Sequence, residues 1–301
     1  MTVVERNARA IDRANEYVVR RLQERDQIRH MLEARRTYAA YALGQLDPVL
    51  FRMSEWWGAH GVGGQAVILH SHGGLGSATF VMGDSAPLEA LLQTHPGPRQ
   101  TFFTCEVHHL DTVLRYFDLE QRQTMIRMHV TGDRFKAAEG EARRMVGRDV
   151  RTINSLYRTD GVPSFYSSRQ IDDSAYFGIE RDGRLVSIAG THVISAVSGI
   201  AVVGNVYTHP QYRGQHLAQI ATSAVTELLL KTCREVVLSV DPTNKSAVRA
   251  YERLGYVEVA RLIEGAALRR DGTGAFTTIR RIAARMRGRG TGTEIIRLRP
   301  D

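Results

Sequence analysis

The sequence predicts an α/β (α+β) fold in which helices flank a mixed, twisted β-sheet. Short apolar runs with strand spacing alternate along the chain with helical patterns, which favours a sheet covered by helices. The same order of elements (helix, hairpin, strand, helix, strand) occurs in both halves of the 301-residue chain. A chain of this length accommodates two domains. We therefore expect two similar halves and a remote duplication, although no repeat is visible residue by residue.

The first half begins with helical patterns. Apolar residues from Val4 to Leu22 recur at helical spacing, and a second helical stretch runs from about Asp26 to Leu43, ending near Gly44 and Pro48. Trp56 and Trp57 are interpreted as core anchors. The other expected elements are a hairpin of strands at Ala66–His70 and Ala78–Met82 around the glycine-rich turn Gly73–Gly76, helices at Leu88–Gln93 and His109–Phe117, and strands at Phe102–Cys105 and Thr124–Val130.

The second half follows a polar segment, Gly132–Arg148, in which we place the domain boundary. The expected division is an N-terminal domain at 1–140, a second domain at 141–275 and a basic extension at 276–301. The expected elements are helices at Asp149–Tyr157, His216–Lys231 and Asn244–Leu254, and strands at Ala175–Glu180, Arg184–Val193, Ile200–Thr208, Val236–Val240 and Tyr256–Ile263.

The segment from Gly204 to Ala218 runs from the end of a predicted strand, through a short loop, into a long helix. N–H groups at a helix start have no partner inside the helix, and the helix dipole is positive there. This end therefore suits a phosphate or pyrophosphate. Gly214 and Ala218 let the backbone approach an anion closely, and Arg213 adds a positive charge. Taken alone, the pattern is also that of a simple strand-to-helix turn.

A second segment, from Asp241 to Tyr256, follows the predicted strand Val236–Val240. Asn244, Ala247 and Tyr251 lie at i, i+3 and i+7, which places an amide, a small side chain and a phenol on one helix face. A capping asparagine and a half-buried core tyrosine would explain each polar residue alone. Their combination, downstream of the arginine-glycine loop, indicates a binding groove.

Both segments resemble the cofactor-binding core of the GCN5-related N-acetyltransferases, the GNAT enzymes. That family has an Arg/Gln-x-x-Gly-x-Gly/Ala loop, which Arg213 and Ala218 match at its ends. It also has an Asn-x-x-Ala-x-x-x-Tyr helix followed by Gly-Tyr/Phe, which is matched by Asn244, Ala247, Tyr251, Gly255 and Tyr256. The resemblance covers roughly residues 149–268 and implies the acyl-CoA N-acyltransferase fold. The N-terminal half lacks both motifs, so a degenerate GNAT-like domain that does not bind CoA is expected there.

The resemblance implies acetyl-CoA (an acyl-CoA) as co-substrate, no metal, and direct attack by a primary amine in a ternary complex. The pantetheine arm would lie along the strand Val206–Thr208, a backbone N–H near Val206 would polarise the thioester carbonyl, and Tyr251 would protonate the departing thiolate. The expected catalytic residues are Tyr251, Val206 and Asn205. The expected cofactor-binding residues are Val206, Tyr207, Thr208, Arg213, Gly214, Gln215, His216, Leu217, Ala218, Asn244 and Tyr251.

Two positions depart from the family pattern. His216 stands at the middle glycine of the loop, where helical φ and ψ remain open to it and its ring could add a hydrogen bond to a phosphate. The strand Ile200–Val206 has no carboxylate to act as general base. Asn205 could position a water, and His192 on the neighbouring strand is the nearest titratable candidate, although a lone strand histidine is more often structural.

The net charge of +8 comes almost entirely from arginine. Such a charge fits nucleic acid, a membrane surface or an anionic cofactor. The tail Phe276–Asp301 has seven arginines and two acids without interleaved aromatic residues, so we favour a solvated basic face or a docked strand at Thr293–Leu298 over nucleic-acid binding. Thr278–Met286 has helical spacing. The absence of an apolar spanning stretch or signal region, and two distant cysteines, predict a cytoplasmic protein.

Several alternatives stay open. His70 and His72, with His60 nearby, could bind a metal, but a hairpin explains them and no metal is expected. The expected partner is a small-molecule or peptide amine: amino acid, polyamine, antibiotic or protein. Neither membrane nor nucleic acid is expected, and a homodimer is possible. His216 and the missing carboxylate motivate one alternative, a catalytically degenerate CoA-binding regulatory module, and the arginine content motivates a less favoured nucleic-acid binder.

Overall fold

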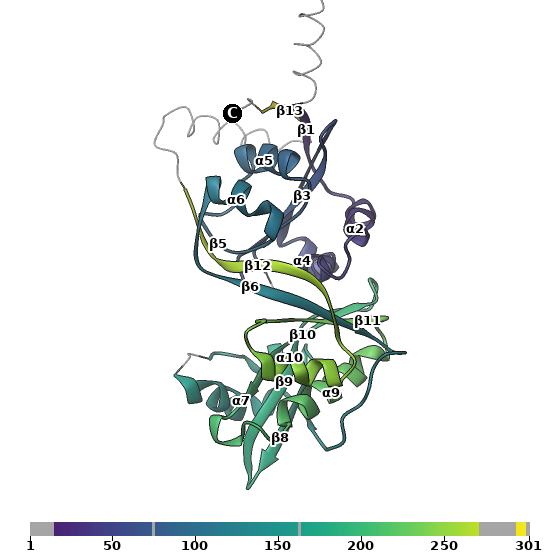
Figure 1. Ribbon diagram of the computed structural model, residues 1–301, viewed down its shortest axis with the longest axis vertical. Helices are drawn as coiled ribbons and strands as arrows, with labels where there is room; N and C mark the ends of the chain where they lie inside the picture. The colour runs from purple at the N-terminus through teal and green to yellow at the C-terminus, as the bar shows by residue number, and fades with distance from the viewer. Residues whose placement is uncertain (1–14, 74–75, 162–163, 271–292, 299–301) are drawn as a thin grey trace, which may run out of the picture. The chain divides into compact units, whose positions relative to one another are not determined.

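The computed structural model describes residues 15–73, 76–161, 164–270 and 293–298. Contacts between residues divide the chain into two compact units (Figure 1). Unit 1 contains residues 1–34, 45–124 and 261–301, and unit 2 contains residues 35–44 and 125–260. This division differs from the expected break at 140/141, because the strands β6 (Phe117–Thr131) and β12 (Val257–Arg269) each begin in one unit and end in the other.

Unit 1 is built on a mixed sheet with the strand order β13-β1-β2-β3-β4-β5-β12. Neighbouring strands are antiparallel except for β4 and β5, which are parallel. The strands are β1 (Glu16–Arg21), β2 (Ser54–Gly61), β3 (Gly64–Ser71), β4 (Ala78–Gly83), β5 (Gln100–Glu106), the second part of β12, and β13 (Thr293–Arg297). The helices are α2 (Arg25–Glu33), α4 (Pro48–Phe51), α5 (Ser85–Thr94) and α6 (Leu110–Tyr116).

The start of the chain differs from the expectation. Residues 1–14 of the predicted first helix lie outside the described residues, and Glu16–Arg21 forms strand β1. Tyr17 and Val19 are buried while Val18 is only partly buried, so the strand alternation holds here. The predicted helix from Asp26 to Leu43 is broken into α2 and the short α3 (Ala40–Gly44), which belongs to unit 2.

Other expectations in unit 1 are met. The hairpin of β3 and β4, the helices α5 and α6 and the strand β5 lie where the sequence predicts them. The two tryptophans are buried in β2, a strand that the sequence reading omitted. The predicted C-terminal strand is β13, which pairs with β1, whereas Thr278–Met286 lies outside the described residues.

Unit 2 is built on a sheet with the strand order β6-β11-β10-β9-β8-β7. Only β10 and β11 are parallel neighbours. Besides the second part of β6, the strands are β7 (Arg143–Met145), β8 (Tyr176–Arg181), β9 (Arg184–Ser195), β10 (Ile200–Thr208) and β11 (Glu235–Val240). The helices besides α3 are α7 (Val150–Tyr157), α8 (Ser168–Asp172), α9 (Leu217–Leu230) and α10 (Lys245–Arg253). The sequence predicted these elements except β7 and α8.

The two halves of the chain share one order of elements. The series β2, β3, β4, α5, β5, α6, β6 matches the series β8, β9, β10, α9, β11, α10, β12. In each series the third and fourth strands are the parallel pair, joined by a helix. This agrees with the expected duplication.

The two faces of the unit 2 sheet differ in chemistry. One face packs Met128, Leu238 and Val203 against Leu217, Ala221 and Val225 of α9 in an apolar core. The opposite face includes Arg127, His129 and Ser239, and α3 lies against β9 and β10 on it. This approach is close, since a Cβ added to Gly44 of α3 would lie 2.3 Å from Val193 Cγ1. No helix in the described ranges is long and apolar enough to cross a membrane.

Candidate active site

A fork between two parallel strands is the central feature of unit 2. The strands β10 and β11 pair from Ile200 opposite Glu235 to Val203 opposite Leu238. Beyond these residues the ladder stops, although β10 continues to Thr208 and β11 to Val240. Each strand then leads through a short loop into a helix, α9 after β10 and α10 after β11. Two helix N-termini, with their positive dipole ends, therefore follow the fork.

A β-bulge exposes backbone groups of β10 at this fork. The register with β9 shifts between Gly204 and Tyr207, and Asn205 has a φ of +53°. Asparagine tolerates this left-handed conformation better than most residues. Val206 lies inside the register shift and past the β11 ladder, so its backbone N–H is outside both ladders. This is the group that the resemblance assigns to the thioester carbonyl.

Tyrosines hold the bulge in place. The Tyr157 hydroxyl donates to the Asn205 carbonyl oxygen at 2.5 Å, and Asn205 Nδ2 donates to the Tyr176 hydroxyl at 2.8 Å. Tyr166 lies between them, with ring centroids 5.3 Å from Tyr157 and 6.0 Å from Tyr176. Burial raises the pKa of Tyr157 well above its usual value. The proton needed for the bond to Asn205 is therefore retained at neutral pH.

The loop before α9 presents unpaired N–H groups. Gly214 has a φ of +81° and His216, the N-cap residue, has a φ of +59°. The histidine thus takes a left-handed conformation, which favours glycine, and not the helical one that the sequence reading allowed. Among the described residues no backbone hydrogen bond uses an N–H from Gly214 to Ala218. The His216 ring is turned to α10, where Arg253 Nη1 donates to Nδ1 at 3.2 Å.

Arg213 lies at the start of this loop and is held by three contacts. Its Nε donates to the Thr208 carbonyl oxygen at 3.2 Å, its Nη2 forms an ion pair with Asp160 at 3.0 Å, and its guanidinium lies 5.9 Å from the Tyr207 ring centroid. Both partners of the ion pair are substantially exposed, and such pairs contribute little stability. An incoming phosphate could therefore replace Asp160 at small cost.

The second motif lies on α10. Asn244 is the N-cap, and its Oδ1 accepts from the Ala247 N–H at 3.1 Å and from Ser246 Oγ at 2.9 Å. Its capping role is therefore real, and its Nδ2 has no hydrogen bond among the described residues. Tyr251 is buried, which raises the pKa of its hydroxyl to about 12. No hydrogen bond within the described part of the chain uses that hydroxyl.

On the opposite face, His192 packs against the first residue of β10 beyond the ladder. A Cβ added to Gly204 would lie 2.0 Å from His192 Nε2, so glycine provides the room that the ring occupies. The His192 ring centroid is 5.8 Å from that of Tyr41, and the guanidinium carbon of Arg127 lies 5.0 Å from the centre of the same ring. Burial and, second, the nearby Arg127 lower the pKa of His192 to about 4. The ring is therefore neutral at pH 7.

An ion-pair network anchors the segment that carries Tyr41. Arg36 Nε pairs with Glu235, Arg36 Nη2 donates to the Ser198 carbonyl oxygen at 2.7 Å, and His129 Nδ1 lies 3.1 Å from Glu235 Oε2. Burial raises the pKa of Glu235, but the bonds from His129 and Arg36 outweigh it and leave the pKa lowered. Glu235 begins β11 and lies at the end of the strand away from the fork. We regard this network as structural.

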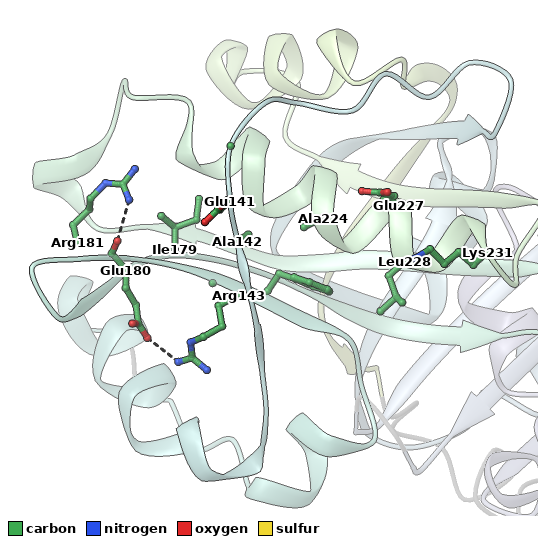
Figure 2. Close-up of a pocket in the computed structure, with 13 residues that line it drawn as sticks. Glu141, Ala142, Arg143, Ile179, Glu180, Arg181, Ala224, Glu227, Leu228 and Lys231 are labelled. Atoms are coloured by element: carbon green, nitrogen blue, oxygen red, sulfur yellow. Dashed lines mark hydrogen bonds and ion pairs between the residues drawn. The ribbon is translucent and has the colours of Figure 1, made fainter.

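A cavity of about 590 Å³ lies elsewhere in unit 2 (Figure 2). It is lined by β8, the second half of α9 and the segment at 140–143, and its charged lining includes Glu180, which pairs with Arg143 at 2.7 Å. Ala224 and Glu227 of α9, and Lys231 directly after it, line the same space. None of the expected site residues lines this cavity, so it is distinct from the fork.

Clustered histidines of unit 1 serve structural bonds. His70, one of the residues considered for a metal, is buried between Thr79 Oγ1 at 3.1 Å and the His95 carbonyl oxygen at 3.0 Å. Glu106, His108 and His109 bring possible ligand atoms within 4.8 Å of one another. Both of these histidine rings contact the Gly83 carbonyl oxygen through Nε2, at 3.2 and 2.7 Å. These bonds join the turn before α6 to the end of β4.

The expected site residues lie along β10, in the following loop, in the first turn of α9, and at the N-cap and inner side of α10. The sequence reading missed the tyrosines around Asn205 and the pair of Arg127 and Tyr41. A glycine inside an apolar strand, Gly204, was an available signal for the bulge. The contact of Arg127 with Tyr41, and the hydrogen bonds of Asn205 with Tyr157 and Tyr176, join residues more than 25 positions apart and had no local signal.

Comparison with known proteins gives a consistent result. The model of the "Acetyltransferase (GNAT) family" matches residues 148–256. A search of curated proteins by sequence finds no significant match. A GCN5-related N-acetyltransferase from Kribbella flavida superposes with a TM-score of 0.56 at 19% identity, covering 79% of this chain and 98% of that one.

Two further structures match over most of their length. A Drosophila protein has a TM-score of 0.59 at 13% identity, covering 83% of this chain and 98% of its own. A tandem GNAT protein from the clavulanic acid biosynthesis pathway has a TM-score of 0.51 at 13% identity, covering 86% and 100%. These likenesses show a shared fold. Within the chain, residues 148–256 match the model of the GNAT acetyltransferase family and contain both motifs.

Proposed function

We propose that unit 2 transfers an acyl group, most simply acetyl, from acyl-CoA to a primary amine. The observation that carries the proposal is the fork itself. A backbone N–H at Val206, outside both ladders, lies on the strand that leads into the unpaired N–H groups of Gly214 to Ala218. A thioester donor that also carries a pyrophosphate needs both features, in this order along one strand and loop.

In this proposal the cofactor is held by the chain in three places. The N–H groups from Gly214 to Ala218 and the positive end of α9 bind the pyrophosphate, and Arg213 exchanges Asp160 for a phosphate. The pantetheine amides pair with Val206–Thr208, whose edge toward β11 is free beyond Val203. The Asn244 amide group, at the start of α10, is placed to bond the cofactor on the other side of the fork.

The reaction is a direct transfer. The amine nitrogen attacks the thioester carbon, a C–N bond forms, and the Val206 N–H stabilises the negative charge on the carbonyl oxygen. Collapse breaks the C–S bond, and the electron pair leaves with sulfur as the CoA thiolate. The nitrogen loses its proton to a water. Asn205 Oδ1, which has no partner among the described residues, can hold that water while Nδ2 is fixed by Tyr176.

Tyr251 assists the leaving group in this proposal. A thiol has a pKa near about 8.5, whereas the pKa of Tyr251 is raised to about 12. Full proton transfer from the phenol to the thiolate is therefore unfavourable, and Tyr251 acts as a hydrogen-bond donor to the sulfur. This refines the general-acid role implied by the resemblance.

Calorimetric titration with acetyl-CoA tests the cofactor site. Ala218→Leu places a larger side chain where the pyrophosphate approaches α9, so we expect affinity to fall at least tenfold, roughly the loss of one charge-assisted hydrogen bond. Ala224→Leu is the control, since it makes the same change on the same helix where the side chain faces the cavity. Wild-type affinity in a folded Ala218→Leu protein would refute this site.

The same titration tests the role of unit 1. Its sequence lacks both motifs, so we expect one acetyl-CoA per chain. A stoichiometry of two equivalent sites would show that the parallel pair β4 and β5 also binds the cofactor.

A further inference from the structure

A fully buried arginine stands on the face of the unit 2 sheet opposite α9 and α10. Arg127 has no exposed surface. Its Nη1 donates to Ser239 Oγ at 2.7 Å, and its guanidinium carbon lies 5.0 Å from the centre of the Tyr41 ring. Its Nε and Nη2 are also buried and, among the residues that the structure describes, have no hydrogen-bond partner.

The two unused nitrogens form one binding edge. The N–H of Nε and one N–H of Nη2 run parallel along the same side of the planar guanidinium, the geometry that matches the two oxygens of a carboxylate. A buried cation without hydrogen bonds or a counter-charge is costly, so groups of this kind are normally paired. A carboxylate would supply both bonds and the opposite charge.

The acids at the two ends of β11 are already engaged. Glu235 is bound by Arg36 and His129. Asp241 Oδ1 accepts from both the N–H and the Oγ1 of Thr243 at 2.7 Å. The ion pairs within the described part of the chain include none with Arg127. Within the described ranges, this edge of the guanidinium therefore has no acidic partner.

The position of the guanidinium is that of an acceptor site. Arg127 is opposite Ser239, the residue that follows Leu238, where the ladder between β10 and β11 ends. Tyr41 contacts both Arg127 and His192, and His192 packs against Gly204, the first residue of β10 beyond the ladder. These side chains border the fork on the face away from α9 and α10, whereas the cofactor groups follow the loops to those helices.

We propose that Arg127 binds the carboxylate of the amine acceptor through Nε and Nη2, and that the acceptors are amino acids or other amines with a free carboxylate. The inference rests on the proposed acyl transfer, whose acceptor class it names. Tyr41 flanks the guanidinium and keeps its plane fixed. Because the site is buried, the bidentate pair forms away from bulk water, where charge-assisted bonds are strong.

The first test compares acids with amides in acetyl-CoA-dependent thiol release. A panel of α-amino acids is offered, each as the free acid and as its carboxamide. We expect Arg127→Met to lower kcat/KM for the preferred acid by at least about 30-fold, the lower end for losing one partner of a buried charge pair, and to leave the amide unchanged. Arg127→Lys keeps the positive charge but not the planar guanidinium. This variant should also lose most of the preference for acids over amides.

Arg169→Met is the matched control, because Arg169 is 90% exposed on α8. An equal loss on acids and amides would show that Arg127 supports the fold alone and would overturn the proposal. So would a wild-type protein with no preference for acids. If the Met variant does not fold, the acid-to-amide ratio of the Lys variant decides the question by the same criterion.

The second test separates this inference from the proposed reaction. Calorimetry measures binding of N-acetylated amino acids and of their carboxamides, with CoA present, to wild type and Arg127→Met. Binding of acids that is lost in the variant supports the carboxylate site even if no amine yields thiol, in which case only the proposed transfer fails. If no acid in the panel shows binding that depends on Arg127, the carboxylate site is refuted, whatever the outcome of the transfer assay.

Discussion

Removal of one hydroxyl, by Tyr251→Phe, separates the chemical role of this residue from its packing. The ring is buried in the core beneath α10, and the hydroxyl takes part in no hydrogen bond within the described part of the chain. The substitution therefore leaves the packing intact. We expect a stability change within about 0.5 kcal/mol, since a group without a protein partner is removed.

The kinetic effect follows from the pKa. With a hydroxyl at about 12 and a thiol near about 8.5, proton transfer to the thiolate is uphill by about 5 kcal/mol. The hydroxyl therefore contributes a hydrogen bond to a charged acceptor, which is worth about 1.5–3 kcal/mol. We expect kcat to fall about 10- to 150-fold, while acetyl-CoA affinity changes little because the pyrophosphate is bound elsewhere.

Tyr256→Phe is the matched control. Its hydroxyl bonds Thr226 Oγ1 at 2.7 Å in the core. This change should lower the free energy of unfolding by about 1 kcal/mol and leave kcat unchanged. The assay is thiol release at saturating acetyl-CoA and amine, with solvent viscosity varied to confirm that chemistry limits turnover. A wild-type kcat in Tyr251→Phe under those conditions would refute the assignment.

Three further outcomes are expected. Tyr157→Phe removes the hydrogen bond to the Asn205 carbonyl oxygen and should lower kcat about two- to tenfold. An unchanged kcat would show that the bulge in β10 keeps its conformation without this hydrogen bond. His216→Gly should retain acetyl-CoA affinity and His216→Val should lose it, by calorimetry, because a β-branched residue avoids positive φ; equal affinities would contradict this. Burial lowers the pKa of His70 to about 4, so urea unfolding should show stability falling from pH 6.5 toward 4, by on the order of 3 kcal/mol; His70→Gln should flatten that slope.

The sign of the His70 effect follows from proton uptake. The unfolded chain takes up a proton near pH 6.5, whereas the native ring resists it until about pH 4. The stabilisation is therefore present above pH 6.5 and is lost as the pH falls through this window. A slope that is the same in His70→Gln would place the acid sensitivity in other groups.

Local patterns explain why much of the fold could be predicted. Strands such as β3, β4 and β11 are apolar runs bounded by turn residues, and α9 and α10 have clear helical spacing. The prediction of a helix at Glu16–Arg21 was wrong. The apolar residues there have helical spacing, but the segment forms a strand that pairs with β2 and β13. The division into units was not predictable locally, because β6 and β12 cross from one unit to the other.

The cofactor motifs were readable because their residues are close in sequence. Gly214 and His216 lie in one loop, with Ala218 in the first turn of the helix that follows, and Asn244 caps the helix that contains Tyr251. The opposite side of the fork was not readable, because Tyr41, Arg127, His192 and Ser239 come from four separate elements. Only tertiary structure brings an arginine from β6 to a tyrosine from α3. The conformation of His216 likewise follows from the loop and not from its own preference.

Acyl transfer itself is the central claim, and one measurement tests it most directly. The purified 301-residue chain is incubated with acetyl-CoA and a panel of amines, free thiol is followed, and the amines are then analysed by mass spectrometry. We predict saturable thiol release that requires both an amine and the wild-type Ala218, with the acetyl group recovered on the amine nitrogen. Saturable acetyl-CoA binding without any acetylated amine, or thiol release by hydrolysis alone, would contradict the account and favour a CoA-binding module without transferase activity.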